Sequence, residues 1–266
     1  MKQPFPARLT ALTALTVTTA SAFVATPAFA QADAQDPSLG QAHRGHESPQ
    51  NFAAEVRFAA FTPEVDSDPN LGGKTPYKDT FGSAPRLEVG LEFDWQALRI
   101  PHFGTIGPGV SAGYTKASDP ALFQQEHNGT KVSGEQTTLE IFPFYGVLVL
   151  RADVLWRDAG VPLVPYGKIG LGYALWRASN TVGTSNDQGL SGQGSSFGTQ
   201  VALGLAFNLN PFDIYAAQNF DDALGVNNSY IFAEWTRSDL DGSLSSQKNV
   251  LRVGGTAWTF GLAFEF

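Results

Sequence analysis

The sequence contains no cysteine, and no stretch of it approaches the roughly 20 consecutive apolar residues that a membrane-spanning helix needs. Without disulfides, an exported form of this chain must be held together by core packing or by a closed, hydrogen-bonded sheet. Charged residues make up only 16% of the chain, and the 25 acidic residues outnumber the 17 basic ones. This acidic balance argues against a nucleic-acid-binding protein.

The first 30 residues predict a secretory signal peptide. Lys2 and Arg8 give it a positive start, an apolar run covers residues 9–24, and residues 28–30 form an Ala-Phe-Ala cleavage pattern. The run is too short and too rich in Thr for an anchor, and the lack of a nearby cysteine excludes a lipoprotein. Residues 31–51 are polar and aperiodic, so we expect a flexible periplasmic tail. One folded domain then remains, at residues 52–266.

The clearest pattern lies in residues 256–266. Large apolar residues at every second position, from Trp258 to Phe266, alternate with Thr259, Gly261, Ala263 and Glu265. A strand places such alternating side chains on opposite faces. An apolar face towards lipid and a small or polar face towards a lumen are typical of an outer-membrane β-barrel. We expect the barrel-assembly machinery to recognise the chain through Phe266.

Eight segments of this kind predict an all-β fold, an eight-stranded antiparallel up-and-down transmembrane barrel. They cover residues 52–61, 86–95, 104–115, 136–156, 164–176, 199–207, 229–237 and 256–266. In the fourth segment Leu139 and Ile141 are expected to face outward. A bulge near residues 143–146 would then change the parity before Leu148, Val154 and Trp156.

The connections support the same topology. Long polar segments (62–84, 116–135, 178–198 and 238–255) alternate with short turns (97–103 and 157–162), as loops and periplasmic turns do in such barrels. Both termini would lie in the periplasm. Outward aromatic residues near the strand ends predict interfacial girdles; these are Trp95, Tyr114, Trp156, Tyr173 and Trp235. A secreted β-sandwich is the rival fold, and it would cover the apolar faces with a second sheet.

Residues 210–225 break the alternation of long and short connections. Pro211 stands near the start of this segment and Gly225 just past its end, while Ile214, Ala217 and Leu224 recur at helical spacing. The segment predicts a short periplasmic helix between the sixth and seventh strands. We expect it to plug the barrel end or to lie on the inner leaflet, with partner docking as the alternative.

Three stretches resemble a known family. They are residues 61–66 with Pro76-Tyr77 and Phe81-Gly82, residues 162–168 with 170–173, and residues 258–262 with Phe266. In them the chain is similar to small outer-membrane barrel proteins from myxobacteria and relatives, an OmpA-like barrel family of unassigned function. The resemblance covers most of the mature chain. It implies a fold and a location in the outer membrane, but no activity.

Many charges fall on the parity that would face the lumen. They are Glu55, Arg57, Arg86, Glu88, Glu92, Asp94, Arg151, Asp153, Lys168, Glu234 and Glu265. Buried charges are costly unless paired, so the first interpretation is a salt-bridge network that fills a narrow eight-stranded lumen. A cation-preferring pore and a pair of catalytic carboxylates are the alternatives.

Other polar groups form no convincing site. Residues 66–70 begin like a calcium loop, but Leu71 and Tyr77 replace the required Gly and Glu, and residues 239–242 are a similar fragment. Divalent-ion binding beside lipopolysaccharide phosphates is a weaker alternative. His43, His46, His102 and His127 fall in the tail, a turn and a loop, and only a forced grouping of His127 with Ser133 or Glu126 suggests rim catalysis. Residues 128–130 match a glycosylation sequon, which means little in a bacterial context.

The sequence therefore predicts a non-enzymatic barrel of the cell outer membrane with a structural or surface-interaction role. We assign no catalytic, cofactor-binding or metal-binding residue. The alternatives are a narrow small-solute or cation channel and an outer-membrane lipid-modifying enzyme or protease. The expected partners are outer-membrane lipid and lipopolysaccharide, not nucleic acid, and we expect a monomer.

Overall fold

The structure is a computed structural model that describes residues 50–122, 132–180, 183–184, 186–187, 190–243 and 250–266. The signal peptide predicted at residues 1–30 lies outside the described residues, as does the predicted tail up to residue 49. The last residue of that tail, Asn51, is hydrogen-bonded to the folded domain through its backbone N–H, which donates to the Phe266 carbonyl oxygen at 2.9 Å.

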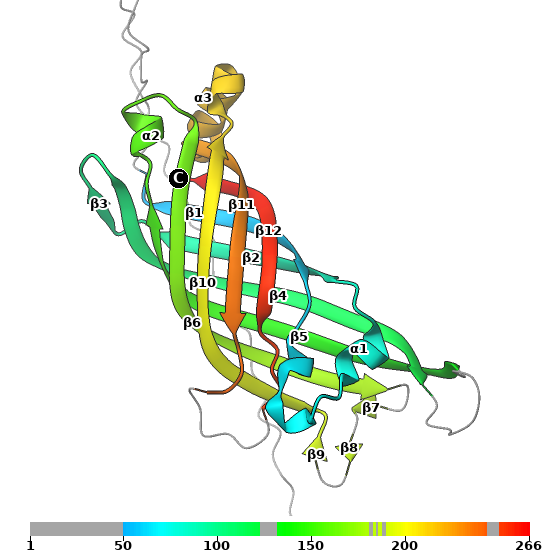
Figure 1. The fold of residues 1–266 in the computed structure, drawn as a ribbon. Helices are drawn as coiled ribbons and strands as arrows, with labels where there is room; N and C mark the ends of the chain where they lie inside the picture. Colours follow the sequence, from blue (N-terminus) through cyan, green and yellow to red (C-terminus); the bar gives the residue numbers. More distant parts are fainter. Residues whose placement is uncertain (1–49, 123–131, 181–182, 185, 188–189, 244–249) are drawn as a thin grey trace, which may run out of the picture. The chain divides into compact units, whose positions relative to one another are not determined.

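Eight long strands close into a barrel (Figure 1). They are β1 (Phe52–Phe61), β2 (Arg86–Trp95), β4 (Gly104–Leu122), β5 (Val132–Arg151), β6 (Leu163–Asn180), β10 (Gln193–Asn208), β11 (Asn228–Asp239) and β12 (Gly255–Glu265). Each pairs antiparallel with its neighbours along the chain, and β12 pairs with β1 to close the ring. The predicted eight-stranded up-and-down barrel is confirmed, and the β-sandwich is excluded.

Shorter elements lie at the two ends of the barrel (Figure 1). One end carries β3 (Leu98–Ile100), α2 (Val154–Arg157), η3 (Asn210–Phe212) and α3 (Ile214–Leu224), and we call it the α3 end. The other end, called the loop end, carries η1 (Val65–Ser67), η2 (Pro69–Leu71), α1 (Pro76–Phe81), β7 (Gly183–Thr184), β8 (Asn186–Asp187) and β9 (Leu190–Ser191). Among the described residues, no helix is long and apolar enough to cross a membrane.

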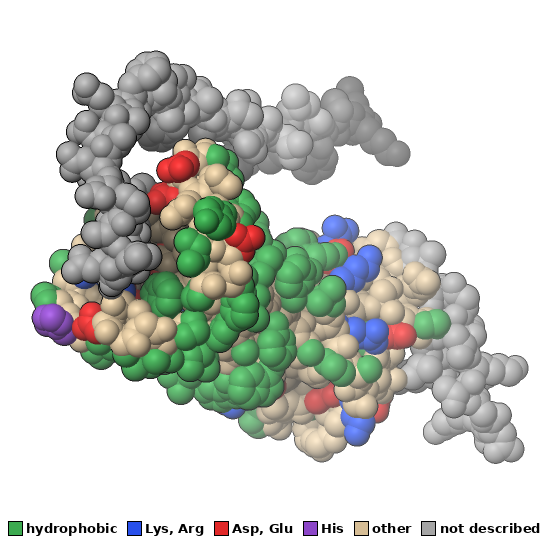
Figure 2. Space-filling model, turned by 90° about the horizontal axis from the view of Figure 1, so that it is seen from above, with side chains coloured by type: hydrophobic (Ala, Val, Ile, Leu, Met, Phe, Trp, Pro, Cys, Tyr) green, Lys and Arg blue, Asp and Glu red, His purple; other side chains and the backbone are tan. Residues whose placement is uncertain are grey.

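The barrel wall alternates between exposed apolar and buried side chains. On β10, Leu203 is 66% exposed while its neighbour Ala202 is 1% exposed; on β2, Leu91 is 62% exposed and Glu92 is 3% exposed. Figure 2 shows the outward apolar side chains as a continuous area over the visible wall, with most of the visible Lys and Arg side chains towards one end and Asp and Glu side chains towards both ends. Such a band, on a closed sheet whose backbone groups are paired, is the surface that a barrel presents to hydrocarbon.

Strand β5 corrects two expectations. It ends at Arg151, and residues 154–157, predicted as its last part, form α2 instead. Its register with β4 and with β6 is continuous through residues 143–146, so the predicted bulge there is wrong; the register shift of this pair lies at Pro120/Leu122. Leu139 and Ile141 face inward, at 5% and 2% exposure. The parity appeared to change because the interior becomes apolar towards the loop end.

Strands β4, β5 and β6 are much longer than predicted, at 19, 20 and 18 residues, whereas β1 and β2 have 10 each. Their extra length takes up parts of the segments 116–135 and 178–198 that were interpreted as loops. The outward side chains described there, such as Lys116 and Arg177, are polar, so the alternation that marks a lipid-facing strand is missing. The sheet therefore continues past the apolar band at the loop end, as an extension made of β4, β5, β6 and the start of β10.

The predicted helix between the sixth and seventh barrel strands is confirmed as α3. Asp213 caps its start by accepting the Ala216 backbone N–H at 2.9 Å, and Gly225 ends it with φ +70°, a left-handed conformation that favours glycine. Its apolar residues do not plug the barrel, because Ile214 and Leu224 are 62% and 68% exposed.

Four of the five predicted girdle aromatics lie on barrel strands, and Trp95, Tyr114 and Tyr173 are exposed on the outer face. Trp156 is the exception. It lies on α2 and packs against a buried cluster at the α3 end that includes Tyr166 and Tyr230.

Replacing Gly261 with alanine is expected to destabilise the barrel by about 1–3 kcal/mol, the usual cost of overpacking. A Cβ at this position would lie 2.0 Å from the Val56 carbonyl oxygen and 2.7 Å from the Phe232 ring, at the β12–β1 seam. Urea unfolding of the refolded protein measures the change. Gly146→Ala is the matched control, because a Cβ there has no atom within 4 Å, and a similar loss in both variants would contradict the packing argument.

Candidate functional site

The middle of the barrel interior holds seven charged side chains that we call the charge network. They are Glu55, Arg57, Glu92, Asp94, Arg151, Lys168 and Glu234. They come from β1, β2, β5, β6 and β11, and all are at most 8% exposed. Because inward positions on these strands converge on one axis, residues up to 179 positions apart in sequence meet in the lumen. All seven were among the eleven lumen charges predicted from parity.

Each cation of the network contacts at least two carboxylates. Arg57 Nη1 donates to Glu55 at 2.7 Å and to Glu92 at 2.8 Å, and its Nη2 pairs with Glu234. Arg151 Nη2 lies 2.6 Å from Glu55 and 2.7 Å from Asp94. Such multiple, charge-assisted hydrogen bonds are what offset the cost of burying ions.

Lys168 completes the network from the opposite wall. Its Nζ lies 2.9 Å from Glu55 Oε2 and 3.1 Å from Glu234 Oε2, and it also pairs with Glu92. The ammonium group is 5.0 Å from the centre of the Tyr166 ring, and the Arg151 guanidinium is 5.4 Å from that centre. An aromatic face stabilises nearby cations, so Tyr166 supports the network from the α3 end.

The remaining four predicted lumen charges have other surroundings. Glu265 accepts hydrogen bonds from Gln96 Nε2 at 2.8 Å and from the Tyr230 hydroxyl at 2.7 Å. Arg86 pairs with Asp119 at the loop end. Glu88 borders a cavity between the charge network and the loop end of the interior.

The prediction that Asp153 is a lumen charge on a barrel strand is partly wrong, because Asp153 lies just after the end of β5, at the α3 end. It pairs there with Arg99 and Arg157, both at 2.8 Å. Sequence reasoning missed Arg99 because β3 lies in a segment interpreted as a turn.

The loop end of the interior is closed by an apolar plug that the sequence analysis did not predict. Its larger residues are Phe61, Val65, Tyr77, Phe81, Leu139, Ile141, Leu240 and Val253, all buried. They come from the end of β1, from the loop-end half of β5, from the connections that carry η1 and α1, and from residues 240–243 and 250–254. The inward parity of Leu139 and Ile141 was the available signal, and the assumed bulge concealed it.

The calcium-like fragment at residues 66–70 has a structural use in the plug. Asp66 accepts the backbone N–H groups of Tyr77 at 2.7 Å and Lys78 at 2.9 Å, in the first turn of α1. Asp68 accepts the N–H of Asn70 at 2.9 Å and caps η2. Burial raises the pKa of the Tyr77 phenol, and the neighbouring Arg86 opposes that shift. Asp66 therefore ties the η1 turn to the start of α1, and Asp68 closes the η2 turn.

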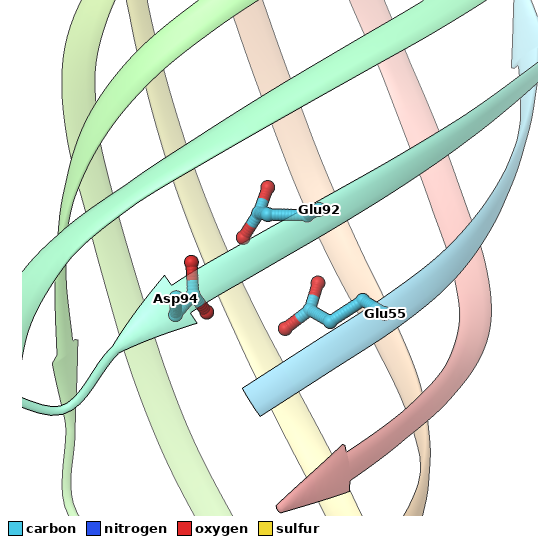
Figure 3. Close-up of side chains that lie close together, drawn as sticks. All are labelled: Glu55, Glu92 and Asp94. Atoms are coloured by element: carbon cyan, nitrogen blue, oxygen red, sulfur yellow. The ribbon is translucent and has the colours of Figure 1, made fainter. Parts of the chain in front are cut away.

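Three network carboxylates approach one another closely enough to suggest a metal site. Oxygens of Glu55, Glu92 and Asp94 lie within 4.8 Å of one another, and Figure 3 shows the three side chains on β1 and β2 turned towards the same space. Each of them is already engaged by Arg57, Arg151 or Lys168. The trio is therefore part of the salt-bridge network.

The histidines give no catalytic grouping among the described residues. His102 is exposed in the turn after β3, with Nδ1 3.4 Å from an Asp158 oxygen. His43, His46 and His127 lie outside the described residues, as do Glu126 and the sequon at 128–130.

No protein-family model matches the chain, and no curated protein matches it. Among solved structures, it is similar to the Neisserial surface protein NspA, with 13% identity, 82% of this chain and 95% of that chain covered, and a TM-score of 0.42. It is similar to Ail of Yersinia pestis with 15% identity, 82% of this chain and 97% of that chain covered, and a TM-score of 0.40. It is also similar to the outer membrane protein OprG of Pseudomonas aeruginosa, with 13% identity, 84% of this chain and 98% of that chain covered, and a TM-score of 0.44.

The fold and its surface define the class of this protein. A closed antiparallel barrel of eight strands, apolar outside and polar within, is an outer-membrane β-barrel. Its main internal features are the charge network and the apolar plug, and strands β4, β5 and β6 extend its wall at the loop end.

Proposed function

We propose that the protein is a closed, non-enzymatic barrel of the outer membrane that presents a structural or surface-interaction face to the outside of the cell. The observation that carries this proposal is the double closure of the interior, by the charge network in the middle and by the apolar plug at the loop end. A barrel of eight strands is only just wide enough for its own side chains. Paired and packed side chains leave solutes no room to pass.

The extension of β4, β5 and β6 supports the surface role. It continues beyond the apolar band and carries exposed polar and charged residues, including Lys116 on β4 and Arg177 on β6. Residues held on a paired sheet keep a fixed spacing, which a recognition surface requires. We propose that this face contacts envelope components such as the phosphates of lipopolysaccharide.

At the α3 end, we propose that the exposed apolar side of α3 lies against the inner leaflet. The Phe212 ring contacts Phe207 on the outer wall at 5.7 Å, so the apolar band continues into the helix region. Three expectations from the sequence stay predictions. They are membership of the myxobacterial family, the monomeric state, and recognition of Phe266 by the barrel-assembly machinery.

Purified full-length protein in planar lipid bilayers is expected to show no conductance steps. The reason is that an ion would have to break several buried ion pairs and then cross the apolar plug. A known porin inserted under the same conditions serves as the positive control. Reproducible steps that scale with the amount of inserted protein would contradict the closed barrel and favour the channel alternative.

The enzyme alternative has a separate readout. Incubation of the protein with lipopolysaccharide, followed by mass analysis of the lipid, is expected to leave the lipid mass unchanged. A time-dependent loss or gain of an acyl chain would replace the proposed function with a lipid-modifying activity.

A further inference from the structure

A polar cavity lies inside the barrel between the charge network and the apolar plug. It has a volume of about 40 Å³. It exists because small inward residues on neighbouring strands, such as Ala59, Gly90 and Gly113, leave space where the network and the plug do not meet. A water molecule needs roughly 10–15 Å³ of such space, so the cavity has room for an ion with one or two waters.

The walls of this cavity offer mainly oxygen atoms. The polar residues that border it, apart from Arg57, include Glu88, Ser111, Tyr145, Gln200, Thr236 and Ser238. The Glu88 carboxylate forms no hydrogen bond or close ion pair with any residue that the structure describes. Gln200 is 4% exposed, and its Oε1 is buried without a hydrogen-bond partner. A buried acceptor that lacks a partner costs free energy, so Gln200 Oε1 calls for a hydrogen-bond donor or a cation. Glu88 is half-buried at the same cavity, and its negative charge favours a cation over a neutral donor.

The charge balance of the interior points the same way. Six carboxylates face the middle of the barrel interior (Glu55, Glu88, Glu92, Asp94, Glu234 and Glu265), against the three cations Arg57, Arg151 and Lys168. Arg86 lies on the same face of β2 as Glu88, but at the loop end it is held by Asp119 and by the Phe81 carbonyl oxygen. Arg57 borders the cavity, but its Nη1 and Nη2 are held by Glu55, Glu92 and Glu234. Glu88 therefore lacks a cation of its own among the described side chains.

We propose that this cavity binds a small monovalent cation of the size of sodium, held by the Glu88 carboxylate, Gln200 Oε1 and neighbouring hydroxyl oxygens. One carboxylate with neutral oxygens suits a single positive charge. A calcium ion takes six to eight oxygen ligands, usually with several carboxylates, and the cavity supplies only one. The bound ion neutralises Glu88 and supplies the missing partner of Gln200.

The test compares unfolding in sodium chloride with unfolding in N-methyl-glucamine chloride, at constant ionic strength, for the full chain refolded in detergent micelles. Above the dissociation constant, each tenfold rise in sodium is expected to raise the folded-to-unfolded ratio about tenfold. Glu88→Gln is expected to abolish this dependence and to be at least as stable as the native chain without sodium. Asp222→Asn, which alters an exposed carboxylate on α3, is the control and should keep the dependence.

A high-resolution crystal structure of the native chain grown in sodium chloride provides a second, independent readout. A density peak beside the Glu88 carboxylate, with oxygen neighbours closer than hydrogen-bonded water allows, supports the proposal even if the Glu88→Gln variant fails to fold, and Gln200→Leu should weaken the sodium dependence. The proposal is overturned if the native chain unfolds identically in both salts. In that case the cavity holds no sodium ion, and Glu88 is either protonated or in contact with water alone. It is also overturned if sodium stabilises the native chain and Glu88→Gln equally, because the ion then binds elsewhere.

Discussion

Replacing Lys168 with methionine is expected to lower the free energy of unfolding by about 3–5 kcal/mol, the usual cost of removing one partner from a buried ion pair. Lys168 is buried on β6 and contacts Glu55, Glu92 and Glu234. Methionine is flexible and close to lysine in length, so the packing volume is largely kept and the effect reports on charge. Urea unfolding in lipid vesicles, followed by heat-modifiable mobility on a gel, measures the loss.

Lys116→Met is the matched control for this experiment. Lys116 is exposed on β4, so its replacement should change the stability by less than about 0.5 kcal/mol. Adding Glu92→Gln to the Lys168→Met variant should recover part of the loss, because Glu92 then keeps only Arg57 as a cationic partner and the change removes one surplus buried negative charge. Equal stability of Lys168→Met and Lys116→Met would show that the network does not stabilise the barrel.

Replacing Leu91 with arginine is expected to cost about 2–4 kcal/mol in a lipid bilayer, the range for a cationic side chain on the lipid face near the membrane midplane. Leu91 lies in the middle of β2, 62% exposed, between outward residues of the neighbouring strands, Val56 on β1 and Ala112 on β4. The guanidinium would have to enter hydrocarbon or bend away from it. Urea unfolding in vesicles of fixed composition measures the cost.

The control is the same change at Leu98, which is 66% exposed but lies on β3 in the turn at the α3 end. Outside the apolar band the arginine stays in water, so Leu98→Arg should be nearly neutral. If both variants lose the same stability, the outward face of β2 does not contact hydrocarbon. That result would remove the basis for a membrane-spanning barrel.

Local alternation predicted the barrel wall well where one face meets lipid. On β2 the outward residues Leu87, Leu91 and Trp95 alternate with polar ones, and the predicted range of residues 86–95 matches the strand. The same rule failed where lipid is absent. The outward residues at the loop ends of β4 and β6, such as Lys116 and Arg177, are polar, so alternation was missing there. The segment around Leu139 and Ile141 is apolar on the inside, so alternation was misassigned there.

The candidate site was predicted as a set of residues but not as an arrangement. Parity alone placed Glu55, Arg57, Glu92 and Lys168 in the lumen, because the side-chain period of a strand is two residues. Parity carries no information about depth along the barrel axis. Glu88 and Glu92 share one face of one strand, yet Glu92 joins the network while Glu88 borders the cavity.

The sequence by itself determined that this chain forms an antiparallel barrel of eight strands with a lipid-facing outside, because that property depends on neighbours two residues apart. Only the tertiary structure decided which charges pair, that an apolar plug seals the loop end, and that a polar cavity separates the two. Those contacts join residues far apart in the chain, and they depend on strand register and on the small residues of facing strands, which no local pattern encodes.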